Sequence, residues 1–451
     1  MTATGSRGWT WALVALAALF PVGWLLLPLV WPARSHMPAV SSQLNSPVLL
    51  ITVPGLRADR VHHLGYERAI TPTLDRLAEQ GVSFRTCWSQ SNQSLASAAA
   101  LLTGRCPLKT GVLAAGDRLK QGHETLGEFF QGAGYRTAGV VADPELLDAN
   151  LEQGLDAWKP LPGQLSDAVV DEALRQIDAA HDGPWLLWLD FADLLPPYGG
   201  AQLPVADFAP GAPAGFGSTP DDYDLGDEKL AARGWGEQQL GWLDARYDAA
   251  LQHLDAQIGR LLDALAARNR LETLTVCLAG LRGERLAERP PRRFVHGVDL
   301  YESSLHVPLL LRLPAQEGRG QLIPRLAQLL DIGPTLADIA LKKPWARTNG
   351  RSLKVSIQAL TPVNKAIFAQ GFVQDAPGQA PIAAAAVRTG AGKSMVKLIL
   401  DEQGGVLGAF RLPDDAAETR SLTLGGQQLE LLHEQWTAAL GEQAGCVPAP
   451  K

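Results

Sequence analysis

The stretch from Ser89 to Arg105 holds the residues of this sequence best suited to chemistry. Its hydroxyl- and amide-rich first part leads directly into a run of alanine and leucine that predicts a helix. Ser94 stands at the start of that run, where its side chain could cap the free N–H groups of the helix. Alternatively, it could present a nucleophile where the helix N-terminus favours an incoming anion. Taken alone, the stretch favours capping.

Alternating strand and helix patterns surround this stretch. Short apolar runs predict strands at 47–53, 81–87, 136–141, 185–190, 274–279 and 308–313, and helical spacing predicts helices at 71–79, 125–132, 165–180, 240–268 and 331–339. This alternation predicts an α/β fold with a large mixed, mostly parallel sheet and helices on both faces. Ligands of such sheets bind beyond the carboxyl ends of the strands.

The pattern changes after about residue 346. Short alternating runs at 366–372, 384–388 and 395–400 predict a small C-terminal subdomain with an antiparallel sheet. We therefore divide the chain into an anchor or signal segment, a linker, a large α/β domain, a C-terminal α+β subdomain and a tail, at residues 1–34, 35–46, 47–345, 346–430 and 431–451.

Residues 9–31 are almost wholly apolar, and their length matches the ~20 residues that cross a bilayer as a helix. The tryptophans at both ends suit the two membrane interfaces. The run is long for the core of a signal peptide and lacks a clear cleavage site, so an uncleaved single-pass anchor is favoured over a cleaved signal or a buried helix. The lipid bilayer is therefore one expected partner, although Arg7 and Arg34 leave the orientation undetermined by charge.

The composition argues against a nucleic-acid partner, a disulfide scaffold and a zinc site. The 451 residues carry a net charge of -7 without a long basic run, which argues against a nucleic-acid partner. Four cysteines are too few for a disulfide scaffold, and their spacing does not suggest zinc. Cys87 and Cys277 lie in apolar, strand-like segments and are expected to be buried free thiols.

Several short motifs, in order from about Ser46 to Leu424, resemble the sulfatase family of the alkaline-phosphatase superfamily. They include the first strand and its loop, the end of the signature stretch, and later segments, at 49–59, 101–104, 301–308, 331–336 and 350–353. The resemblance implies the α/β fold described above and hydrolysis of sulfuric or phosphoric esters. It also implies a divalent cation such as calcium, held by acidic residues after two strands, which neutralises the ester and activates the nucleophile.

The expected metal ligands are replaced in this chain. Pro54 and Gly55 stand where the family has an acidic pair, and neither offers a side-chain ligand. Leu281 and Arg282 replace the later pair, and the guanidinium would repel a metal ion. We therefore predict no metal ligands and no cofactor.

The catalytic side chains are also incomplete. The resemblance places Ser94 at the nucleophile position and keeps Ser97, but the proline and arginine of the family motif are absent around them. Leu195 stands where the family has the histidine that assists the leaving group. His296 is similar to a substrate-contacting histidine, and a buried hydrogen-bonding role is equally open.

Three arginines could still bind an anion, because guanidinium binds sulfate or phosphate bidentately. Arg57, Arg105 and Arg282 lie on segments that converge on the site in the family, and Ser97 completes the candidate set. For Arg57 and Arg105, a structural or surface salt bridge is the favoured alternative.

The sequence thus predicts a membrane-anchored sulfatase-family pseudoenzyme, with its main domain outside the cytoplasm by family habit. It could retain binding of a sulfated or phosphorylated ligand, or act as a scaffold for a protein partner that the sequence does not identify. Two alternatives stay open. The first is an active ester hydrolase that uses Ser94, and the second is a purely structural or scaffold membrane protein. On this interpretation, capping remains the favoured role of Ser94.

Overall fold

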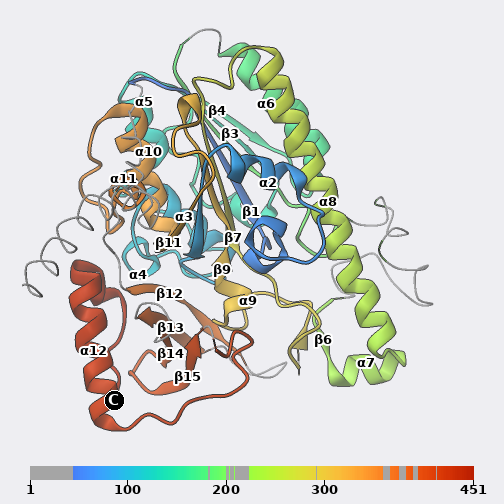
Figure 1. The fold of residues 1–451 in the computed structure, drawn as a ribbon, viewed down its shortest axis with the longest axis vertical. Helices are drawn as coiled ribbons and strands as arrows, with labels where there is room; N and C mark the ends of the chain where they lie inside the picture. The colour runs from blue at the N-terminus through green and yellow to red at the C-terminus, as the bar shows by residue number, and fades with distance from the viewer. Residues whose placement is uncertain are drawn as a thin grey trace, which may run out of the picture. The chain divides into compact units, whose positions relative to one another are not determined.

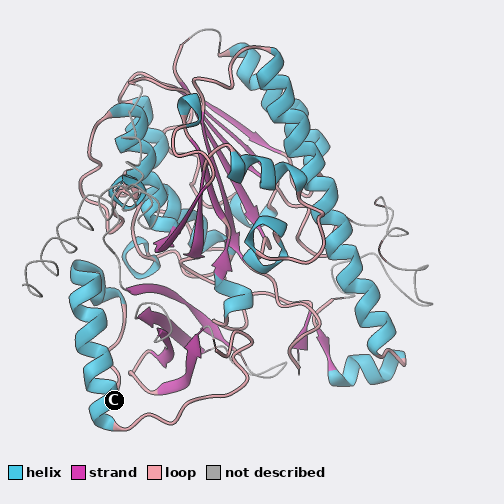
Figure 2. Ribbon diagram, viewed as in Figure 1, coloured by secondary structure: helices cyan, strands magenta, loops and turns pink. Residues whose placement is uncertain are grey.

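The computed structural model describes residues 44–451 except 181–182, 200–202, 204–207, 209–222, 291, 359–365, 375–381, 390–394 and 413. The predicted anchor at 9–31 lies outside the described residues. No helix within the described ranges is long and apolar enough to cross a membrane. Figures 1 and 2 show a large sheet between two sets of helices and a smaller sheet beside α12.

The large sheet has nine strands in the described residues, in the order β11-β2-β10-β7-β1-β5-β3-β4, with β9 paired to β2. The neighbours of β1 are both parallel to it, and β10 runs antiparallel between β7 and β2. The strands are β1 (Val48–Pro54), β2 (Val82–Trp88), β3 (Arg136–Val141), β4 (Ala157–Pro160), β5 (Trp185–Asp190), β7 (Thr275–Arg282), β9 (His306–Val307), β10 (Leu309–Arg312) and β11 (Gln321–Gln328). The predicted mixed, mostly parallel sheet is confirmed.

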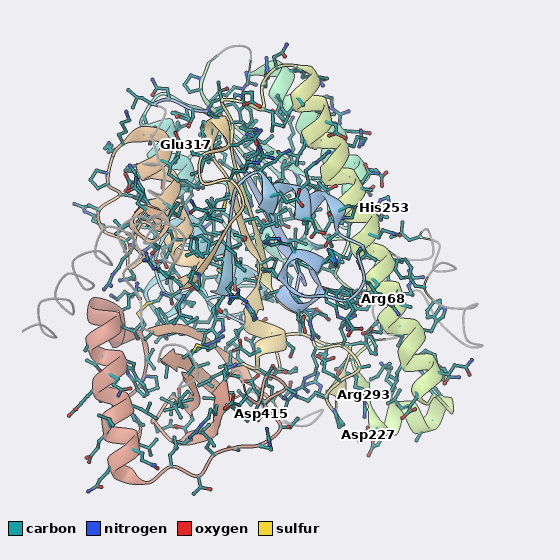
Figure 3. The ribbon with its side chains drawn as sticks, in the orientation of Figure 1. Arg68, Asp227, His253, Arg293, Glu317 and Asp415 are labelled. Atoms are coloured by element: carbon teal, nitrogen blue, oxygen red, sulfur yellow. A yellow bond between two sulfur atoms is a disulfide. The ribbon has the colours of Figure 1, made fainter. Side chains whose placement is uncertain are left out.

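Helices cover both faces of this sheet, and for that reason its central strands read as continuous apolar runs. All seven residues of β1 are buried. Alternate residues of β1 join two separate cores, Leu49 with one helix layer and Leu50 with the other. The first layer contains α2 (Pro72–Glu79), α6 (Ser166–Ala179) and α8 (Glu237–Ala267), and the second contains α3 (Ser94–Thr103), α5 (Leu126–Gln131) and α10 (Ile332–Leu341). Figure 3 shows side chains filling the space between the sheet and these helices.

Local signals in the sequence explain where several of these helices begin. Pro72 occupies the first turn of α2, where its missing N–H costs no hydrogen bond. Thr125 and Glu128 form a capping box at the start of α5, since each side chain accepts a hydrogen bond from the other residue's N–H group. Shorter helices are α4 (Pro107–Thr110), α7 (Asp227–Arg233), α9 (Glu302–Leu305) and α11 (Lys354–Gln358), and β6 (Leu225–Gly226) pairs with β8 (Arg292–Arg293).

The C-terminal part forms the predicted antiparallel sheet, with four strands. They are β12 (Ala366–Val373), β13 (Ile382–Thr389), β14 (Met395–Asp401) and β15 (Val406–Leu412). Helix α12 (Gly426–Leu440) buries Trp436 in the same core as Phe368 and Leu398. The range predicted as a tail, 431–451, therefore includes most of α12 and contributes to the core of this subdomain.

The four cysteines form one disulfide and two free thiols. Cys106, before α4, is bonded to Cys446, which ties the end of the chain to the large domain across 340 residues. Cys87 and Cys277 are free and buried, as predicted.

Candidate active site

The carboxyl ends of β1, β3, β5 and β7 meet at one edge of the large sheet, because these strands are parallel. The loop before α3 brings Ser94 to the same edge. We call the side chains gathered there the Ser94 centre: Ser94, Asp143, Glu145, Asp190, Arg282, Glu284 and His296. Five of its members, Ser94, Asp143, Asp190, Arg282 and Glu284, are at most 1% exposed.

Arg282 links the members of the Ser94 centre. Its Nε donates a hydrogen bond to Ser94 Oγ at 2.9 Å, and its Nη1 pairs with Glu284 Oε2 at 2.6 Å. Burial raises the pKa of Glu284, but the charge of Arg282 outweighs this effect and lowers the pKa. The carboxylate form is therefore favoured. The guanidinium and this carboxylate therefore form a buried ion pair in direct contact with Ser94.

Two further carboxyl groups lie at the ends of β3 and β5. Asp190 accepts hydrogen bonds from the Thr52 hydroxyl at 2.7 Å and from the Asp143 N–H at 3.2 Å. Burial raises the pKa of Asp190 well above its usual range, and the neighbouring Asp143 adds to the effect. Burial likewise raises the pKa of Asp143. Both shifts favour the neutral acids, which lets two acidic groups lie side by side.

His296 lies at the rim of the centre, with 28% of its side chain exposed. Its ring nitrogens lie 3.6 Å from a Glu284 oxygen and 3.8 Å from a Glu145 oxygen, which is too far for hydrogen bonds but close enough for charge interaction. Burial and Arg282 lower the pKa of His296, but the two carboxylates outweigh them and the net shift is upward. The upward shift favours the protonated form of His296, which would be a second cation among the acidic groups.

The remaining candidates are placed differently. Arg57 contacts the centre, because its Nη1 donates to the backbone oxygen of Glu284 at 3.0 Å, but its guanidinium is also paired with Asp59 and Glu288. Ser97 Oγ lies 2.7 Å from Ser89 Oγ and accepts from the Ser91 N–H, so it shapes the turn before α3.

Arg105 is not brought to the centre. It follows the far end of α3, a ten-residue helix, and is therefore about 15 Å along the helix axis from Ser94. Its Nη1 lies 3.2 Å from His123 Nδ1.

The capping role expected for Ser94 is wrong. Gln93 occupies the cap position of α3, and no side chain caps that helix. The Ser94 hydroxyl instead accepts the hydrogen bond from Arg282, a contact between residues 188 positions apart that helix patterns cannot reveal.

The residues at the expected metal positions do not fit a divalent cation. Pro54, Gly55 and Leu281 supply no side-chain oxygen, and Arg282 brings a positive charge. Position 55 is also closed to a larger residue, because a Cβ on Gly55 would lie 2.5 Å from the backbone oxygen of Leu194. Within the described ranges, no three His, Cys, Asp or Glu side chains are arranged to hold a metal ion.

The surroundings of Ser94 also do not activate a nucleophile. Its hydrogen-bond partner is a guanidinium, which stays protonated and cannot accept the hydroxyl proton. Leu195, at the position expected for the leaving-group histidine, has no titratable group. Among the hydrogen bonds of the described residues, none joins the Ser94 hydroxyl to a group that could accept its proton.

The carboxyl groups of the centre were not among the sequence candidates. Asp143, Glu145, Asp190 and Glu284 all lie at or shortly after the carboxyl end of a predicted parallel strand. That shared position was the signal that could have identified them.

Comparisons with known proteins agree with this fold. The family model described as Sulfatase matches residues 46–342. The chain is 25% identical over 368 residues to an ulvan-active sulfatase of Formosa agariphila, covering 72% of this chain and 69% of that protein. It is 33% identical over 121 residues to arylsulfatase K of Rattus norvegicus, covering 27% of this chain and about a fifth (21%) of that protein's length.

Solved structures give the same result at the level of the fold. The phosphonate monoester hydrolase of Agrobacterium radiobacter superposes with a TM-score of 0.68 at 17% identity, covering 88% of this chain and 96% of that one. The chain belongs to the sulfatase family.

Proposed function

We propose that this chain is a sulfatase-family pseudoenzyme that does not hydrolyse esters and works instead as a binding or scaffold protein. The observation that supports the proposal is the buried guanidinium of Arg282, which contacts Ser94 and pairs with Glu284. A fixed positive charge at that place replaces the cation on which the family's chemistry depends, and it leaves Ser94 without a base.

The proposal does not extend to sulfate binding at the Ser94 centre. Arg282 is paired with Glu284, His296 lies near Glu284 and Glu145, and the guanidinium of Arg57 is already paired with two carboxylates. A sulfate group would have to compete with these built-in acids for the same cations.

We also propose that residues 9–31 anchor the chain to a membrane, with the described domain outside the cytoplasm. The disulfide between Cys106 and Cys446 supports this location, because disulfides persist mainly in oxidising compartments. Labelling of the full-length protein in intact cells with a reagent that cannot cross membranes tests it. Labelling only after the cells are opened would contradict the proposed orientation.

Turnover of 4-nitrophenyl sulfate and 4-nitrophenyl phosphate by the full-length protein, with and without added calcium, tests the loss of hydrolysis. We expect no turnover above the buffer rate, and no difference between the wild type, Ser94→Ala and the control Ser352→Ala. Turnover that Ser94→Ala abolishes and Ser352→Ala preserves would overturn the proposal and favour the active-hydrolase alternative.

A further inference from the structure

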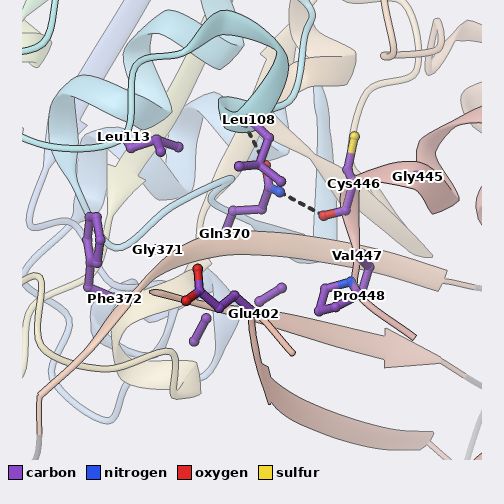
Figure 4. Close-up of a pocket in the computed structure, with 12 residues that line it drawn as sticks. Leu108, Leu113, Gln370, Gly371, Phe372, Glu402, Gly445, Cys446, Val447 and Pro448 are labelled. Carbon is purple, nitrogen blue, oxygen red and sulfur yellow. Dashed lines mark hydrogen bonds between the residues drawn. The ribbon is translucent and has the colours of Figure 1, made fainter. Parts of the chain in front are cut away.

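A cavity of about 260 Å³ lies beside the C-terminal sheet, and none of the residues of the Ser94 centre lines it. Four parts of the chain line it: α4 with the loop that follows, strands β12 and β13, the turn between β14 and β15 with Glu402, and the C-terminal segment from Gly445 to Pro448. Figure 4 shows Leu108, Gln370, Cys446 and Val447 around its centre. One water molecule needs about 10–15 Å³ of such space, so the cavity can admit a ligand much larger than water.

The walls of the cavity are mostly apolar. Leu108 is 58% exposed, which leaves a large apolar side chain uncovered at its edge. The other apolar side chains of the lining are Leu113, Phe372, Ala384, Ala385, Val447 and Pro448. Water in such a space has few hydrogen-bond partners, so displacing it with an apolar group is favourable.

The cavity is held in shape without a ligand. The buried side chain of Gln370 crosses between two walls, because its Oε1 accepts from the Leu108 N–H at 3.1 Å and its Nε2 donates to the Cys446 backbone oxygen at 2.7 Å. The disulfide between Cys446 and Cys106 joins the same two walls covalently. A preformed cavity reduces the entropy lost on binding.

One charge defines the polarity of the cavity. Glu402 is the one acidic or basic residue in its described lining, and it is exposed at the edge. Both donor and acceptor of the Gln370 amide are engaged with the walls, so a ligand would meet mainly apolar surface and one carboxylate. This combination favours a positive charge at one end of an apolar ligand and disfavours an anion.

We propose that this cavity binds a small apolar amine, with the ammonium group directed to Glu402. The apolar end lies between Leu108 and the Val447–Pro448 wall. This site is separate from the Ser94 centre and does not depend on whether that centre is active.

Three probes that share a phenylethyl group but differ in charge test the proposal on the full-length protein: 2-phenylethylamine, 2-phenylethanol and 3-phenylpropanoate. Affinities are measured by ligand-observed NMR titration. We expect 2-phenylethylamine to bind best and 3-phenylpropanoate to bind worst. Glu402→Gln should lower the affinity for 2-phenylethylamine by about threefold and leave the affinity for 2-phenylethanol unchanged.

Glu402→Lys should reverse the order of the two charged probes, and Glu434→Gln, which removes an exposed carboxylate of α12 outside the lining, should change nothing. Both positions are exposed, so the variants are expected to fold. The proposal is overturned if no probe binds the wild type, if the three probes bind equally, or if Glu402→Lys leaves the order unchanged.

Discussion

Two buried charge clusters of this molecule differ in how their charges are balanced. In the Ser94 centre, four carboxyl groups surround Arg282 and His296. The second cluster, which we call the subdomain cluster, consists of Glu302, Arg388, Lys397 and Glu418 and joins α9 to the C-terminal sheet. There Lys397 pairs with both Glu302 and Glu418, and Arg388 pairs with Glu302 at 2.8 Å.

The difference lies in how close the second cation comes to the carboxylate, which is 3.2 Å for Lys397 at Glu302 and 3.6 Å for His296 at Glu284. Glu302 has two cationic partners, so it keeps one if the other is removed. Glu284 has one ion pair shorter than 3 Å, with Arg282, and the next cation is His296 at 3.6 Å. We infer that Arg282 has no effective substitute within its cluster.

The largest effect is expected from Arg282→Leu. Removing one partner of a buried ion pair leaves an unpaired charge, so the free energy of unfolding should fall by about 3–5 kcal/mol. Urea denaturation at pH 7 measures this loss. Arg175→Leu is the matched control, because the Arg175 side chain is 67% exposed and its pair with Glu172 is a surface pair worth less than about 1 kcal/mol. Equal losses of unfolding free energy in both variants would contradict the special role of Arg282.

Chemical rescue sharpens the same test. Arg282→Ala leaves space for a guanidinium group beside Glu284. Millimolar methylguanidinium should therefore raise the Tm of Arg282→Ala but not that of the wild type, because the ion binds the folded state alone. Absence of rescue in a variant that still folds would show that charge is not what Arg282 contributes.

The stability that the subdomain cluster contributes should depend on pH. Burial raises the pKa of Glu302, but Lys397 and Arg388 outweigh it and lower the pKa to about 2. Its folded pKa is thus below the unfolded value of about 4.3, so its contribution is present above pH ~4.3 and disappears as the pH falls towards ~2. The gap in stability between wild type and Glu302→Gln should therefore shrink by about 2–3 kcal/mol between pH 6 and pH 2. Denaturation series at several pH values measure it, and a constant gap would contradict the assignment.

Lys397→Met should lower the free energy of unfolding by about 1–3 kcal/mol, which is less than the loss expected for Arg282→Leu. Arg388 continues to pair with Glu302 in this variant. Burial raises the pKa of Glu418 to about 7, so this carboxyl can take up a proton when Lys397 is lost. Urea denaturation at pH 7 compares the two variants, and a larger loss for Lys397→Met would reverse the comparison.

Ser94→Ala should have the smallest effect. It removes one hydrogen bond from Arg282 Nε while the ion pair with Glu284 persists. The free energy of unfolding should therefore fall by about 1–2 kcal/mol. The same denaturation assay measures it. A loss as large as that of Arg282→Leu would mean that the hydroxyl, and not the carboxylate, is the main partner of the guanidinium.

The sequence predicted the fold well, because continuous apolar runs such as β1 and periodic helices such as α8 carry their burial pattern locally. The partner of Ser94 could not be predicted, because Arg282 reaches it from β7 across the sheet edge. The pairing of Cys106 with Cys446 was missed for the same reason, as spacing along the chain does not report proximity in space.

Calorimetric titration of the full-length protein with calcium tests the central claim most directly. Because the Arg282 guanidinium already fills the cation's role beside Glu284, we predict no stoichiometric calcium binding to the wild type or to Glu284→Gln. One equivalent of calcium bound by the wild type and lost in Glu284→Gln would contradict the account.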